Sequence, residues 1–281
     1  METLTLPTLF LSHGSPMLAV EDDAATAAWD RIGRALPRPR AVLVASAHWL
    51  TAAPALGAAA RPETIHDFGG FPEALYQVRY PVAGDPGLAR EAAELLQAAG
   101  LPAALDPGRG LDHGVWVVLR HLFPDADVPV APLSLQPRLG AAHHYRLGQA
   151  LAPLRDRGVL ILGSGGFVHN LREYFEGQYR AGEPAHVRDF RAWMAARLAA
   201  GDVEALTDYR SQAPFAARAH PTDEHLLPLY VALGAAGRPA PAQLLHDQVA
   251  DGVLGMDAYA FGTPLSLDLP RAKPALTGTH G

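Results

Sequence analysis

Residues 9–16 read LFLSHGSP, and the way in which this apolar run ends bears on the whole fold. Leu9 to Leu11 are typical of a buried strand, which stops on Ser12 and His13 and turns at once through a glycine and a proline. A single histidine after a strand is usually a hydrogen-bonded or solvated residue. Its meaning therefore depends on whether other strands of the chain end in the same way.

Similar apolar runs recur along the chain and alternate with segments of helical spacing. Strands that alternate with helices of this length indicate an α/β fold, in which helices flank a central, mostly parallel sheet. No repeat or linker divides the chain, so we expect a single domain over residues 1–270 and a flexible tail over 271–281. The predicted strands are 8–12, 40–48, 128–135 and 158–165, and the predicted helices are 87–100, 143–156 and 187–200.

The composition narrows the classes of partner and of metal site. The formal net charge of -6 gives no basic field for nucleic acid, which favours a small-molecule partner. The chain has no cysteine, which excludes disulfides, thiolate metal sites and iron–sulfur clusters, so that any metal must bind to nitrogen and oxygen. No apolar stretch is long enough to span a bilayer and no leader-like segment stands out, so we expect a cytoplasmic protein without a membrane partner.

Three of the predicted core strands lead directly to a histidine. His13 follows residues 8–12, His48 ends residues 40–48, and His169 follows residues 158–165 through a glycine-rich turn. The carboxyl ends of parallel strands meet at one edge of a sheet, where α/β proteins bind their ligands. Imidazole is a common metal ligand and also carries protons near neutral pH. The pattern therefore predicts a shared site at this edge, built around a metal.

A fourth candidate lies in residues 220–230, which read HPTDEHLLPLY. Thr222 is predicted to be the N-cap of a helix, with Glu224 and His225 in its first turn. Ordinary capping, with acidic residues placed for the helix dipole, explains Glu224 but gives no reason for His225 or His220. We therefore expect His225 to face the cleft.

Two further stretches carry unusual side chains for loops. Asp112 and His113 begin a predicted helix in GLDHGVW (residues 110–116), where they form part of the site or are only a cap and a surface residue. Residues 64–81, TIHDFGGFPEALYQVRYP, are too rich in aromatic side chains for a mere linker. This segment is either a loop packed down by its own side chains or a wall over the site.

Two other kinds of site are not favoured by the motifs. The turn GSGGFVHN, residues 163–170, lacks both the GxGxxG spacing of dinucleotide-binding loops and the GK[ST] ending of a P-loop. No GxSxG motif is present, which argues against a serine hydrolase with a nucleophile elbow.

Taken in order, the motifs resemble those of the class III extradiol ring-cleavage dioxygenases of the LigB type, in the branch of bacterial and plant DOPA dioxygenases. The resemblance runs from about Leu9 to about Tyr230, and each motif alone is weak. It implies a single-domain α/β fold and a mononuclear non-haem metal site. The motifs are FLSHGSPM, VLVASAHW, TIHDFGGFPEALYQVRYP, LDHGVWVVL, GSGGFVHNL and HPTDEHLLPLY.

The resemblance also implies roles for individual residues. His13, His48 and His225 match the metal ligands of this branch. His169 matches the acid/base catalyst, which is sometimes counted with the metal site, and His113 is expected to act in catalysis or line the substrate pocket. The residues expected to contact the substrate are His66, Phe71, Tyr76 and His113.

The third ligand leaves the identity of the metal open. Better-known relatives hold iron with two histidines and a glutamate, whereas this branch has a third histidine, and Glu224 is the carboxylate that could replace it. Three neutral nitrogens also suit zinc. We expect Fe(II) in turnover and regard Zn(II) as a metal that the isolated protein could carry.

The resulting hypothesis is metal-dependent extradiol cleavage, in which O2 opens the ring of a DOPA-like catechol to a muconic semialdehyde. Two alternatives remain: a zinc-dependent hydrolase built on the same histidines, and a non-catalytic metal-binding relative. Oxygen uptake with a simple catechol separates these alternatives, because neither a hydrolase nor a binding protein consumes oxygen.

Overall fold

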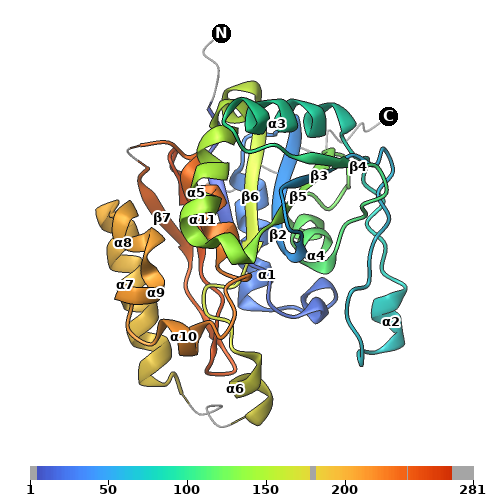
Figure 1. The fold of residues 1–281 in the computed structure, drawn as a ribbon. Helices are drawn as coiled ribbons and strands as arrows, with labels where there is room; N and C mark the ends of the chain where they lie inside the picture. The colour runs from blue at the N-terminus through green and yellow to red at the C-terminus, as the bar shows by residue number, and fades with distance from the viewer. Residues whose placement is uncertain (1–4, 178–181, 239, 268–281) are drawn as a thin grey trace, which may run out of the picture.

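The computed structural model describes residues 5–177, 182–238 and 240–267, in which helices cover both faces of a central sheet (Figure 1). The sheet contains β1 (Thr8–Ser12), β2 (Ala41–Leu50), β3 (Ala55–Gly57), β4 (Ala104–Asp106), β5 (Val130–Leu135), β6 (Val159–Gly165), β7 (Ala242–His246) and β10 (Ala258–Phe261). Its order is β4-β3-β5-β2-β6-β1-β10-β7. The four central strands, β5, β2, β6 and β1, run parallel. The predicted α/β class with a mostly parallel sheet is confirmed.

The helices form a layer on each side of the sheet. On one face lie α3 (Pro86–Ala98), α5 (Gly140–Leu151) and α11 (Leu227–Ala235), and on the other lie α1 (Ala24–Ala35) and α4 (His113–Leu122) (Figure 1). The remaining elements are α2 (Glu73–Tyr76), α6 (Leu171–Glu176), α7 (Ala185–Ala200), α8 (Val203–Thr207), α9 (Tyr209–Gln212), α10 (Ala216–Ala219), the 3-10 helices η1 (Pro16–Ala19), η2 (Pro137–Leu139) and η3 (Ala152–Arg157), and the strand pair β8 (Val249–Ala250) and β9 (Leu254–Gly255).

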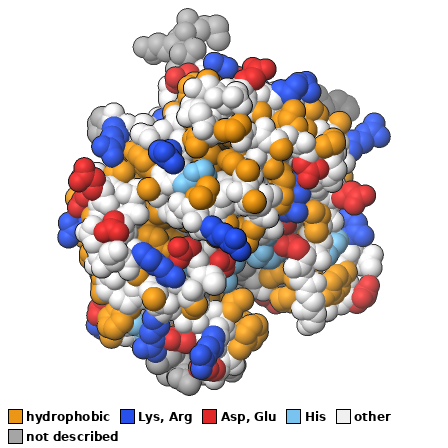
Figure 2. All heavy atoms as spheres, viewed as in Figure 1, with side chains coloured by type: hydrophobic (Ala, Val, Ile, Leu, Met, Phe, Trp, Pro, Cys, Tyr) orange, Lys and Arg blue, Asp and Glu red, His pale blue; other side chains and the backbone are white. Residues whose placement is uncertain are grey.

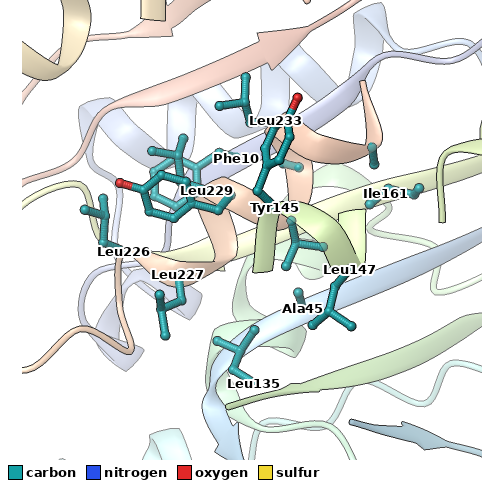
Figure 3. Close-up of a cluster of buried hydrophobic side chains, with 14 of the residues drawn as sticks. Phe10, Ala45, Leu135, Tyr145, Leu147, Ile161, Leu226, Leu227, Leu229 and Leu233 are labelled. Atoms are coloured by element: carbon teal, nitrogen blue, oxygen red, sulfur yellow. The ribbon is translucent and has the colours of Figure 1, made fainter. Parts of the chain in front are cut away.

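The central strands are buried on both faces, which explains why they read as continuous apolar runs. In β1, Phe10 packs into the cluster that contains α11, whereas Leu9 and Leu11 pack into the cluster that contains α1 and α4. Figure 3 shows Phe10 and Ile161 in one cluster with Leu229 and Leu233 of α11 and Tyr145 of α5. This packing fixes the strand ends on which the histidines sit.

Two glycines of β6 let the first turn of α11 and the segment before it approach the sheet closely. A Cβ on Gly163 would lie 2.2 Å from the Pro228 carbonyl oxygen, and one on Gly165 would lie 2.0 Å from that of His225. The same carbonyl of His225 accepts a hydrogen bond of 2.8 Å from the backbone N–H of Gly166. Glycine is required here because any side chain would push the His225 segment away.

The predicted helix start at Thr222 is wrong. Helix α11 begins at Leu227, and the Thr222 hydroxyl donates to the Glu224 side chain instead of capping a helix. The backbone N–H groups of Leu226 and Leu227 both bond to the Asp223 carbonyl, so this segment forms a turn. His225 thus lies in the turn that precedes the helix.

Other elements differ from the sequence expectations in their bounds. The predicted strand over 8–12 matches β1, whereas the predicted helix over 143–156 starts earlier, at Gly140, and changes to 3-10 geometry at Ala152, next to a proline. The antiparallel strands β7 and β10 were not predicted. The tail over 271–281, with the end of the expected domain from residue 268, lies outside the described residues. None of the described helices has the length and apolar character needed to cross a membrane.

Candidate metal centre

Five histidines of the described residues converge at the carboxyl edge of the parallel strands. His13 follows β1, His48 lies near the end of β2, His113 begins α4, His169 follows β6 and His225 precedes α11. The ring centroids of His13 and His48 lie 4.9 Å apart, and that of His225 lies 5.4 and 5.0 Å from them. The structure therefore brings together all of the histidines that the strand-end pattern and the 220–230 motif singled out for this site.

The hydrogen bonds of His13 determine which of its nitrogens faces the site. Its Nδ1 lies 3.0 Å from Ser164 Oγ, and that hydroxyl donates its own proton to the carbonyl oxygen of Gly114. The hydroxyl can therefore only accept from His13, so the proton of His13 is on Nδ1. Nε2 is left with a free lone pair.

Carboxylates face the Nδ1 atoms of two other histidine rings and so influence which nitrogen of each ring carries the proton. Nδ1 of His48 lies 3.5 Å from Asp67 Oδ2, and Nδ1 of His225 lies 3.1 Å from Glu224 Oε1. Because a carboxylate only accepts hydrogen bonds, the bond to Glu224 places the proton of His225 on Nδ1, and the negative charge of Asp67 favours the same tautomer in His48. Carboxylate partners of this kind fix the tautomer of metal-binding histidines and increase their basicity.

This arrangement fits a bound metal ion. The Nε2 atoms of His13 and His48 lie 2.9 Å apart, with lone pairs turned toward the same region. Two nitrogens bound at right angles to one metal, at about 2.0–2.1 Å each, would lie roughly 3 Å apart. With both protons on Nδ1, the two Nε2 lone pairs would repel each other in the absence of a cation. The chemistry of the donor set therefore matches a metal held by imidazole nitrogens.

The ligand atoms form two tight groups. Those of His13, His48 and His113 lie within 4.8 Å of one another, and so do those of His169, Glu224 and His225. The His169 ring stacks on the His225 ring with centroids 3.5 Å apart, and the two groups meet at His225, whose ring lies 5.4 and 5.0 Å from those of His13 and His48. His113, assigned from the sequence to the substrate pocket, thus lies as close to the two strand-end histidines as a ligand would.

Burial keeps these rings neutral. It lowers the pKa of His13 and of His225 well below the usual value, and the neighbouring histidines lower it further. Burial likewise lowers the pKa of His48 to about 3 and the pKa of His169 to about 4. These low pKa values favour the uncharged form of His13, His48, His169 and His225, which metal binding requires.

Asp112 and His220 have structural roles. Although Asp112 occupies the N-cap position of α4, its carboxylate does not cap the helix; it accepts from Ser46 Oγ at 2.6 Å and pairs with Arg109. Burial raises the pKa of Asp112. His220 is fully buried, and its Nε2 donates to the Phe167 carbonyl at 2.9 Å. His113 is not the surface residue of the alternative interpretation, because it is buried.

Part of the loop over residues 64–81 forms an aromatic wall beside the histidines. The Phe68 ring meets the His113 ring edge-on at 5.7 Å and lies 5.3 Å from the Phe71 ring. Tyr76 and His66 continue the wall behind Phe68. Phe68 is therefore nearer to the clustered histidines than Phe71 or Tyr76, although nothing in the sequence distinguishes it from these two. Figure 2 shows histidine atoms lining the hollow between this lobe and the lobe that carries α6.

Comparison with known proteins agrees with this geometry. Residues 7–262 match the family model described as the catalytic LigB subunit of aromatic ring-opening dioxygenase. A protein of Beta vulgaris named 4,5-DOPA dioxygenase extradiol is 41% identical, covering 90% of this chain and 96% of its own length. A protein of Escherichia coli K12 with the same name is also 41% identical, covering 93% of this chain and 97% of its own length.

A solved structure shows the same fold. The crystal structure of an uncharacterized protein from Escherichia coli K12 superposes with a TM-score of 0.76 at 35% identity, covering 91% of this chain and 99% of that one. These matches do not favour the zinc hydrolase or the non-catalytic alternative. The chain belongs to the family of the catalytic LigB subunit of aromatic ring-opening dioxygenases and is a metal-dependent extradiol ring-cleavage dioxygenase.

Proposed function

We propose that this enzyme opens the ring of a catechol that carries a side chain, with DOPA as the model substrate, to give a muconic semialdehyde. The names of the relatives in Beta vulgaris, Escherichia coli and Mirabilis jalapa support DOPA as the substrate class. The observation that carries the proposal is the pair of Nε2 atoms of His13 and His48, 2.9 Å apart, beside the aromatic wall.

His13, His48 and His225 are the proposed ligands, with Fe(II) as the working metal and Zn(II) as an alternative occupant of the isolated protein. His225 is preferred to His113 because its backbone is locked to the end of β6 through Gly166 and its Nδ1 faces Glu224. Neutral imidazole nitrogens can bind either Fe(II) or Zn(II). His169 and Glu224 remain the alternative ligands, because their donor atoms lie close to that of His225.

The roles of the other side chains follow from their positions. The bound metal supplies Lewis acidity that lowers the pKa of the catechol hydroxyls. His169, neutral at pH 7, is placed to accept a catechol proton and to return one later. His113, between Phe68 and the strand-end histidines, lines the position of the catechol ring. His66, Phe71 and Tyr76 lie farther out, where the substrate's side chain would pass.

The proposal is tested by reconstituting the metal-free protein under anaerobic conditions with Fe(II) or with Zn(II). Oxygen uptake and formation of the ring-opened product are then followed with a panel of catechols that differ in side chain. We expect turnover with Fe(II) and none with Zn(II), and faster turnover for DOPA than for unsubstituted catechol. Equal rates across the panel would contradict the substrate class.

The third ligand is tested by three single variants. His225→Ala is expected to lose the metal, because it removes a proposed ligand. Glu224→Gln and His113→Ala are expected to keep most of it when metal is supplied in excess, because Glu224→Gln removes only a partner of His225 and lowers the affinity without removing a ligand. Elemental analysis of the purified proteins measures this directly. Metal loss in Glu224→Gln but not in His225→Ala would restore a site of two histidines and one carboxylate.

The role of the aromatic wall in selecting the substrate is tested with a variant of His66, which lies at the outer end of the wall. The His66 Nε2 donates to the Val78 carbonyl at 3.0 Å, and its ring lies 5.8 Å from Trp116. His66→Ala is expected to change the ratio of kcat/KM values among catechols by several-fold while leaving the metal content intact. A uniform fall in rate for every catechol would show that the loop is only structural.

A further inference from the structure

The carboxylate of Asp67 contacts two of the clustered histidines at once. Its Oδ2 lies 3.5 Å from His48 Nδ1, and its Oδ1 lies 3.0 Å from His113 Nδ1. Oδ1 also accepts a hydrogen bond of 2.9 Å from the backbone N–H of His113. The residue lies on an exposed loop, yet its side chain turns inward and is only 23% exposed.

These contacts give Asp67 two distinct effects. The bond to the His113 N–H satisfies the first donor of α4, which Asp112 leaves open because its carboxylate bonds to Ser46 and Arg109. The negative charge of Asp67, 3.5 Å from His48 Nδ1, favours a proton on that nitrogen, which leaves the Nε2 that faces His13 unprotonated. The first effect is that of an ordinary helix cap, whereas the second acts on a proposed metal ligand.

We propose that Asp67 is a positioning residue that fixes the tautomer and orientation of His48 and thereby sets the affinity of the site for its metal. This inference rests on the proposed role of His48 as a ligand. Asp67 immediately precedes Phe68, whose ring meets His113. One short segment of the loop therefore both orients a ligand and supplies the nearest part of the aromatic wall, which couples the placement of the wall to the metal site.

Two substitutions separate the cap from the positioning role. Asp67→Asn keeps an oxygen that can accept from the His113 N–H, but it turns an amide N–H₂ toward His48 Nδ1, where two donors then meet. Asp67→Ala removes both contacts. If Asp67 were only a cap, the Asn variant would behave as the wild type and only the Ala variant would be impaired. If it positions His48, both variants bind metal weakly.

The matched control is Glu73→Gln, which removes one negative charge from the same loop. Glu73 Oε1 accepts from the Gln77 side chain at 3.0 Å, and within the described part of the chain Glu73 makes no hydrogen bond or ion pair with the clustered histidines. Any loss common to the Glu73 and Asp67 variants would therefore come from the charge of the loop and not from contact with His48.

The experiment measures zinc affinity of the metal-free proteins by competition with a chromophoric chelator, together with their melting temperatures without metal. Asp67→Asn and Asp67→Ala are expected to bind zinc about 10–100-fold more weakly than the wild type, the usual effect of removing such a partner. Glu73→Gln is expected to match the wild type. Wild-type affinity in Asp67→Asn, or a loss that only parallels a lower melting temperature, overturns the proposal. A wild type that binds no zinc overturns the ligand assignment itself.

Discussion

His13→Ala and His48→Ala are each expected to reduce the bound metal from about one ion per chain to almost none, and to abolish ring cleavage. Each variant removes one of the two Nε2 atoms that face each other at 2.9 Å, and the nearest remaining donors belong to other segments. Elemental analysis of protein purified from metal-supplemented medium measures the content. His246→Ala, at the end of edge strand β7 and outside the cluster, is the control and should keep its metal.

The melting temperatures of the metal-free proteins complete this test. His13 bonds to Ser164, so its removal also costs some stability, whereas the effect on the metal should be far larger than any change in the fold. Full metal content in both His13→Ala and His48→Ala would contradict the assignment of the site.

His169→Ala is expected to keep the metal but to slow turnover by roughly 10²–10⁴-fold, the usual contribution of a positioned acid or base. The ring of His169 stacks on His225, and its backbone N–H bonds to the Ala219 carbonyl, so the imidazole is held at the edge of the site. Burial lowers its pKa to about 4, which leaves it able to accept a proton at neutral pH.

Metal content and single-turnover rate must be measured on the same His169→Ala protein. If His169 is a ligand, as its closeness to Glu224 and His225 allows, zinc affinity falls together with the rate. Near-normal values for both would show that His169 is neither a ligand nor a catalyst.

The parallel core and the strand-end histidines could be predicted from the sequence because both depend on local pattern. Buried parallel strands read as continuous apolar runs, and His13 and His48 lie within or directly after such runs. The antiparallel strands β7 and β10 lack this signal: β7 is largely half-buried or exposed, and β10 is only four residues long. The pairing of β10 with β1 also joins segments that lie at opposite ends of the described chain.

The surroundings of the histidines were harder to predict because they depend on contacts between loops. Asp67 reaches His113 across 46 positions of sequence, and Ser164 reaches His13 across 151. The only feature of the sequence that pointed to Asp67 was its position next to His66, in a loop that contains two glycines. The turn at His225 was misread as a helix because an acidic, threonine-led segment before an apolar run also fits an N-cap.

The most direct test of the enzyme's activity is the ratio of oxygen consumed to ring-opened product formed by the Fe(II)-reconstituted enzyme with DOPA. An oxygen electrode and the absorbance of the yellow product follow the two quantities in one sample. If the enzyme performs extradiol cleavage, we expect one mole of oxygen consumed for each mole of ring-opened product formed, and no activity in His13→Ala. Loss of DOPA without oxygen uptake, or oxygen uptake that leaves the aromatic ring uncleaved, would contradict it.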